Sequence, residues 1–154
     1  AGIMDCKRAL QETAGEIEKA LEILRERGFA KAEKRAEREV REGVVEAYIH
    51  TGGRIGALVE INCESDFVAR TDDFKALVHN IAMQVAASEP RFISTDDIPE
   101  DIDEEINPAE ACLLCQPFIR EPQRSIQDII TEVIAKTGEN IKINRFARFE
   151  LGKG

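Results

Sequence analysis

VVEAYIHTGGRIGALVEINCE spans residues 44–64, and its pattern decides the fold. On both sides of Thr51-Gly52-Gly53, apolar residues recur at every second position, which is the period of an extended strand. A short glycine-rich segment between two such runs is a strong signal for a β-hairpin. We therefore predict two antiparallel strands. One face of the first carries Val45, Ala47 and Ile49, and one face of the second carries Ile55, Ala57, Val59 and Ile61.

Two helices are predicted after the hairpin. In residues 72–87, apolar side chains form one stripe at helical spacing, made of Phe74, Leu77, Val78, Ile81, Ala82 and Val85. Ser88-Glu89-Pro90 ends this helix. The second helix begins at Ser125, with Asp128 as its capping-box partner, and ends at Gly138. Its predicted buried face is Ile126, Ile129, Ile130, Val133 and Ile134.

A last strand is predicted in NIKINRFARFELG, residues 140–152, where apolar side chains are spaced roughly by two: Ile143, Ala147, Phe149 and Leu151. Between the two helices, residues 94–110 form an acidic connector with two prolines. ACLLCQPFI, residues 111–119, is a short apolar piece that packs as a strand or a buried loop. Residues 43–154 are therefore expected to form an α+β core, a three-stranded antiparallel sheet backed by helices.

Residues 1–28 are typical of a small helical unit, broken at Gly15 and ended by Gly28. Two short helices bury little surface, so we expect a preceding helix, lost with the natural N-terminus, to complete a three-helix bundle. Residues 29–42 are charged and alanine-rich and predict a linker. Its basic residues are interpreted either as an RNA contact or as part of a solvated tether with alternating charges.

The composition favours protein partners. The chain has 154 residues and a formal net charge of −9, so phosphate would repel most of its surface. No direct nucleic-acid partner and no membrane partner are expected. No apolar run approaches the roughly 18 residues of a membrane span, and no signal peptide is visible. The four cysteines do not form a dense disulfide pattern, which fits a reducing compartment.

Groups suited to catalysis are sparse. His50 and His79 fall on different predicted elements, and a nucleophile pair using Cys63 would lack a third group. Cys112-Leu-Leu-Cys115 has the spacing of zinc and redox sites, but no second pair of this kind exists. Its cysteines are interpreted as small buried hydrophobes, as an intermolecular disulfide, or as a metal or redox site. We predict no catalytic residue, no metal site and no cofactor.

NCESDFVAR, residues 62–70, contains the candidate site. Ser65 or Asp66 can cap a helix, because either side-chain oxygen can accept from N–H groups of the first turn. Phe67 then lies near the helix start. One interpretation packs Phe67 into the core of its own domain, and the other makes it an exposed aromatic anchor for a pocket on a partner protein. The residues alone leave both open.

Three stretches together resemble one family. GIMDCKRAL with AGEIEKALEILRERG resembles the ubiquitin-associated-type N-terminal module of translation elongation factor Ts, without its first helix. EGVVEAYIHTGGRIGALVEINCESDFVAR is similar to the family's hairpin and signature, in which threonine usually stands at Ser65. LLCQPFI and GENIKINRFARFELGKG resemble its C-terminal portion. Members of this family exchange the guanine nucleotide of elongation factor Tu, a GTPase.

The resemblance implies a contact surface for elongation factor Tu. It assigns Asp66 and Phe67, with the adjoining Ser65 and Val68, to a contact near the magnesium and phosphate region of the GTPase. Ile3 and Met4 match a pair of bulky residues through which the N-terminal module contacts the nucleotide domain. The implied location is the cytoplasm of a bacterium or the interior of a plastid or mitochondrion.

The chain departs from the family pattern most clearly in the length of one connection, either because the chain is a very short form or because residues of the natural protein are missing from this sequence. Family members usually have a longer helical region, often a helical hairpin, where IDEEINPAEACLLC bridges the span here. Short members have one core subdomain and resemble dimers that supply two, so a homodimer is implied, with Cys112 or Cys115 as candidate interface residues. Two other functions stay open: a protein-interaction adaptor without exchange activity, and an RNA- or ribosome-associated factor using residues 25–41.

Overall fold

The structure is a computed structural model, and it describes residues 38–153. The first elements in this range are two strands that form a hairpin. Strand β1 (Glu42–Ile49) pairs antiparallel with β2 (Ile55–Cys63). In the turn, Gly52 and Gly53 have φ of 97° and 69°, which glycine adopts without steric cost. The N–H of Gly53 donates to the carbonyl of His50 at 2.9 Å. The predicted hairpin is confirmed.

Strand β5 (Lys142–Glu150) pairs with the other edge of β2, which gives the order β1-β2-β5, all antiparallel. The register between β2 and β5 shifts by one residue near the start of β5. Arg145 lies opposite Glu60 and Ile143 opposite Ile61, so Asn144 is an extra residue on β5. Such a bulge changes which residues of the strand face the helices.

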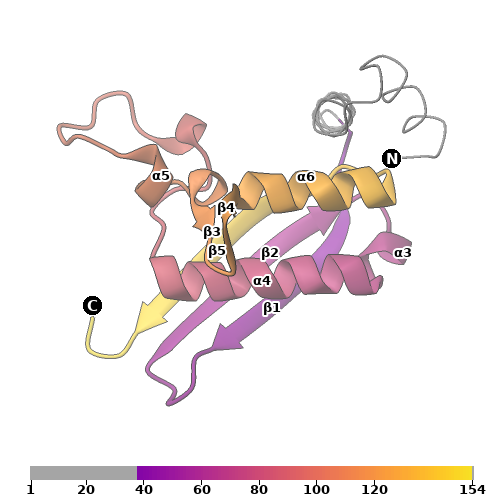
Figure 1. Cartoon of the computed structure of the whole chain (residues 1–154), viewed down its shortest axis with the longest axis horizontal. Helices are drawn as coiled ribbons and strands as arrows, with labels where there is room; N and C mark the ends of the chain where they lie inside the picture. The colour runs from indigo at the N-terminus through magenta and orange to yellow at the C-terminus, as the bar shows by residue number, and fades with distance from the viewer. Residues whose placement is uncertain (1–37, 154) are drawn as a thin grey trace, which may run out of the picture.

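Helices cover one face of this sheet (Figure 1). Helix α3 (Asp66–Ala69) is a single turn directly after β2, and α4 (Asp72–Ser88) and α6 (Ile126–Thr137) are the two long helices. In α6, the Ser125 hydroxyl accepts from the N–H of Asp128 at 3.0 Å, and the Asp128 carboxylate accepts from the N–H of Ser125 at 2.9 Å. The predicted capping box is therefore confirmed.

The core lies between the sheet and these helices. All the residues predicted for the buried stripes of α4 and α6 are buried, as are Ala57, Val59 and Ile61 of β2. Phe74, Ile61, Ile81 and Ile126 are wholly inaccessible. The described part of the chain is thus α+β with a three-stranded antiparallel sheet backed by helices, as predicted.

The connection between α4 and α6 contains several short elements. They are the 3-10 helices η1 (Thr95–Asp97) and η2 (Leu113–Cys115), the helical turn α5 (Pro108–Ala111), and a small hairpin of β3 (Pro117–Phe118) and β4 (Glu121–Ser125). Two buried glutamines fasten it to α4. The Gln84 amide donates to the side chain of Gln116 at 3.0 Å and to the carbonyl of Pro117 at 3.1 Å. The apolar piece at residues 111–119 therefore combines helical turns with a strand.

The sequence did not say which face of each outer strand is buried, and the structure shows it. Val45, Ala47 and Ile49 do share a face of β1, but this face is exposed, and Val44 and Tyr48 pack against the core instead. On β5, the bulge at Asn144 leaves Ile143 facing the core while Ala147 and Phe149 face outward. The open face of the sheet is therefore apolar.

Several predictions concern residues outside the described range. The helical unit at 1–28, most of the linker at 29–42, and Ile3 and Met4 all fall there. Within residues 38–153, no helix combines the length and the apolar character that crossing a membrane requires.

Candidate functional site

The site lies where β2 ends and α3 begins. Ser65 is the N-cap of α3, with extended backbone (φ −127°), and its hydroxyl oxygen accepts from the N–H of Val68 at 3.3 Å. Of the two residues predicted as caps, Ser65 therefore has this role, and Asp66 occupies the first helical position. A carboxylate in the first turn is favourable, because the N–H groups there are unsatisfied.

The ring of Phe67 points away from the core. It is 73% exposed, whereas Val68 and Ala69, the next two residues, are 5% and 6% exposed. Because successive helical residues point in different directions, a one-turn helix anchored by Val68 and Ala69 turns Phe67 outward. The interpretation in which Phe67 packs into its own core is therefore wrong. Val68, which the resemblance assigns to the contact together with Ser65, needs correction, because its side chain is buried in the core.

Asp66 is also exposed. Its carboxylate pairs with the Arg70 guanidinium at 3.2 Å, four residues later in the chain, and both side chains are about 70% exposed (69% and 72%). Exposed pairs of this kind contribute little to stability, roughly 0.3–0.5 kcal/mol. The Asp66 carboxylate can therefore exchange this partner for another at small cost.

The turn that carries Asp66 and Phe67 is fastened to a distant part of the chain. One oxygen of the Glu139 carboxylate accepts from the backbone N–H groups of Glu64 and Ser65, at 3.1 and 2.9 Å. The other accepts from the Ser65 hydroxyl at 2.6 Å. Bonds to an ionised acceptor are among the stronger hydrogen bonds in proteins. No sequence pattern indicates this contact, since Glu139 follows Ser65 by 74 residues.

A buried thiol lies directly under the turn. Cys63 is inaccessible, and its Sγ donates to the carbonyl of Ser65 at 3.2 Å. Burial, and after it the nearby Glu139 carboxylate, raise the pKa of the Cys63 thiol to about 11. Cys63 is therefore a protonated hydrogen-bond donor at neutral pH and is poorly suited to act as a nucleophile.

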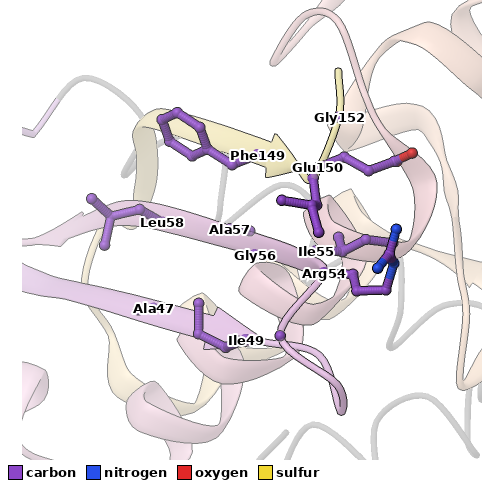
Figure 2. Close-up of a pocket in the computed structure, with 12 residues that line it drawn as sticks. Ala47, Ile49, Arg54, Ile55, Gly56, Ala57, Leu58, Phe149, Glu150 and Gly152 are labelled. Atoms are coloured by element: carbon purple, nitrogen blue, oxygen red, sulfur yellow. The ribbon is translucent and has the colours of Figure 1, made fainter. Parts of the chain in front are cut away.

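The open face of the sheet is a second candidate surface (Figure 2). In one row across the strands, Gly56 lies between Ile49 and Phe149; in the next, Leu58 lies between two alanines, Ala47 and Ala147. Ile49, Leu58 and Phe149 are 65%, 46% and 75% exposed. A hollow of about 550 Å³ lies over Gly56. In the first row the large side chains lie on the outer strands and the central residue is small. In the second row the large side chain is central and the outer residues are small.

The cysteine pair at 112 and 115 is divided between core and surface. Cys112 is wholly buried, Cys115 is exposed, and both are reduced. Burial raises the pKa of the Cys112 thiol. Across residues 38–153, no group of three or more cysteine, histidine or acidic side chains is arranged to hold a metal ion. Of the two cysteines implied at a dimer interface, only Cys115 has an accessible side chain.

Comparison with known proteins gives a consistent result. The sequence model of a family described as "Elongation factor TS" matches residues 5–109. Elongation factor Ts of Carboxydothermus hydrogenoformans is 52% identical over 182 aligned positions, which cover 100% of this chain and 84% of that protein. Elongation factor Ts of Moorella thermoacetica is 49% identical, covering 100% and 90%. For Thermotoga neapolitana the identity is 46%, covering 99% and 91%.

The alignment of 182 positions contains all 154 residues of this chain, so 28 positions of the relative have no counterpart here. With nearly half of the residues identical along the whole chain, the protein belongs to the elongation factor Ts family, a family of translation elongation factors.

Proposed function

We propose that this chain is the guanine-nucleotide exchange factor for elongation factor Tu, and that Asp66 and Phe67 form its contact near the magnesium and phosphate region of that GTPase. Family membership supports the partner. The observation that carries the choice of residues is the 73% exposure of Phe67 on a turn whose backbone is tightly held. A large apolar ring in that position is suited to enter a pocket on another protein.

The physical basis is the sensitivity of the nucleotide site. Bound GDP is held by phosphate contacts and by Mg²⁺, which requires nearly ideal octahedral geometry. A phenylalanine ring inserted between helices of the GTPase near the ion would displace the residues around it. The displacement would weaken both the phosphate contacts and the binding of Mg²⁺. Burial of a phenylalanine side chain contributes roughly 1.5–3 kcal/mol, which can drive this displacement.

The other predicted residues have supporting roles in this proposal. Asp66 leaves Arg70 to accept a hydrogen bond from the GTPase, and its removal should have a milder effect than removal of Phe67. Ser65 caps the turn, and Val68 holds it to the core. Ile3 and Met4 supply a second contact with the nucleotide domain, on the strength of the resemblance alone.

Exchange follows from linkage between two binding equilibria. If the factor binds the empty GTPase more tightly than the GDP-loaded one, then GDP must bind the complex more weakly by the same ratio. No covalent bond is made or broken. The chain is therefore proposed to be an exchange factor and not an enzyme in the covalent sense.

The test is release of a fluorescent GDP analogue from elongation factor Tu, followed by stopped flow. The release rate should rise with the concentration of the chain and then saturate. An adaptor without exchange activity would co-purify with elongation factor Tu and leave the rate unchanged. That pair of results would support the alternative function.

We also propose that the chain acts as a homodimer through the open face of its sheet. A second copy is favoured because this face is complementary to itself. Leu58 is raised between alanines, and Gly56 lies in a hollow between Ile49 and Phe149. A two-fold axis between the two rows would place Leu58 of each copy over Gly56 of the other. The resulting sandwich of two sheets is a common way of burying such faces.

A further inference from the structure

We infer that Glu139 is a positioning residue for nucleotide exchange: its carboxylate sets the direction in which Phe67 is presented. The inference rests on the proposed function, because it assigns Glu139 an effect that passes through Phe67. Glu139 itself is only partly exposed and lies in the turn between α6 and β5. It therefore acts from within the chain.

The first argument is the geometry of the contact. The Glu139 carboxylate accepts three hydrogen bonds, from the N–H of Glu64, the N–H of Ser65 and the hydroxyl of Ser65, all between 2.6 and 3.1 Å. These groups are the last ones before α3. Fixing them fixes the N-cap, and the N-cap sets where the single turn of α3 begins.

The second argument is that the contact is reciprocal. The Glu64 carboxylate accepts from the backbone N–H of Asn140, so each of the two segments supplies a carboxylate to the backbone of the other. Arg38 also contacts both segments. Its guanidinium donates to the carbonyl of Gly138 at 3.1 Å and is 3.7 Å from the Glu64 carboxylate. Bonds in both directions hold the two turns in one relative orientation.

Helix α3 has little internal stability and is held to the core mainly through Val68 and Ala69. It has four residues, and a helix this short is not stable in isolation. Phe67 is mostly exposed and makes little contact that could fix its position. Without the Glu139 carboxylate, Val68 and Ala69 would still turn Phe67 outward, but the N-cap would be held less tightly. The ring would then sample a wider range of orientations, and binding would have to select one of them at an entropic cost. The Glu139 contact removes that cost before the partner arrives.

The experiment is a double-mutant cycle measured by release of fluorescent GDP from elongation factor Tu. Glu139→Ala should lower the second-order exchange rate about tenfold. In Glu139→Gln the amide oxygen can still accept the two backbone N–H bonds, so the loss should be roughly threefold. In a chain that already carries Phe67→Ala, adding either change should cost less than about twofold, because the residue through which Glu139 acts is gone.

Glu132→Gln on α6 is the matched control, because it removes a partly exposed carboxylate with two cationic partners far from the turn. It should leave the rate within about twofold. Glu139→Gln keeps the test valid if Glu139→Ala does not fold. If the fold loss in the double mutant equals the product of the losses in the two single mutants, the two residues act independently. That result would overturn the inference while leaving the role of Phe67 intact. If Phe67→Ala alone exchanged normally, the proposed function of that residue would fail, and this inference with it.

Discussion

The hydrogen bond from Cys63 to Ser65 makes the turn sensitive to alkaline pH. The pKa of this thiol rises from an ordinary 9.0 to about 11, first because of burial and then because of the Glu139 carboxylate. The folded state therefore keeps its proton between these two values, while the unfolded state loses it. A raised folded pKa stabilises the protein fully below the unfolded value, and this contribution disappears as the pH rises toward the folded value.

We therefore expect the free energy of unfolding to fall between about pH 9 and 11, by at most roughly 3 kcal/mol from this thiol. Urea unfolding of the wild type and of Cys63→Ala across this range measures it. The variant should start less stable, because it lacks the thiol, and should show a shallower decline. Parallel curves for the two proteins would contradict the assignment.

At the scale of single residues, the sequence indicated a candidate site but left its geometry open. The resemblance to elongation factor Ts implied the contact at Asp66 and Phe67, and residue types indicated Ser65 or Asp66 as the helix cap. The direction of Phe67 could not be found, because a phenylalanine near a helix start fits a core position as well as a surface one. The direction of Phe67 follows from the burial of Val68 and Ala69, which leaves Phe67 on the outer side of the turn. Glu139 could not be found either, since no local pattern connects residues 74 positions apart.

Among the elements, helix α6 follows the rules for helix ends closely. Its capping box, its buried stripe and its final glycine were all predicted and are confirmed. Gly138 has φ of 77°, in the left-handed region, and an added Cβ would have no atom within 4 Å. Any effect of a side chain there must therefore come from the backbone conformation and not from a clash.

Gly138→Ala should lower the free energy of unfolding by about 1 kcal/mol, the cost of forcing alanine into this conformation. Gly138→Asn should lose less, because asparagine tolerates left-handed backbone better than alanine does. Urea denaturation of the two variants beside the wild type measures both. Equal stability of Gly138→Ala and the wild type would show that the turn can reach another conformation without cost.

The outer strands show where reasoning from periodicity stops. Both faces of β1 carry apolar residues, Val44 and Tyr48 on one and Val45 and Ile49 on the other, so alternation cannot identify the buried face. On β5, the bulge at Asn144 changes the alternation partway along the strand. Only the pairing with β2, whose own inner face is unambiguous, determines which side the helices cover.

For the molecule as a whole, the main consequence is a sheet with one covered face and one apolar open face. The three-stranded antiparallel sheet and the helices behind it followed from sequence, because the hairpin and both long helices have strong local signals. The strand order did not, because nothing in the sequence shows which edge of the hairpin β5 joins. The open face did not, since a single sequence does not show whether an apolar outer position meets solvent or a second copy. Its exposed side chains are the basis of the dimer proposal.

Leu58→Glu should convert the proposed homodimer to a monomer, because it places a charge at the centre of an apolar interface. Sedimentation velocity at several concentrations of the full chain measures the change in mass. Ile119→Glu, at an apolar position 43% exposed and away from this face, is the matched control and should remain dimeric. A wild-type chain that stays monomeric at about 50 µM, or a dimer that persists in Leu58→Glu, would contradict the proposal.

The whole account depends most on Phe67, and stopped-flow release of fluorescent GDP from elongation factor Tu tests it directly. Phe67→Ala should slow catalysed release roughly tenfold or more, as truncation of an interface anchor does. Its unfolding free energy should stay within about 0.5 kcal/mol of the wild type, because the ring is mostly exposed. Ile119→Ala should match the wild type in both measurements. A Phe67→Ala chain that releases GDP at the wild-type rate, or that no longer folds, would contradict the account.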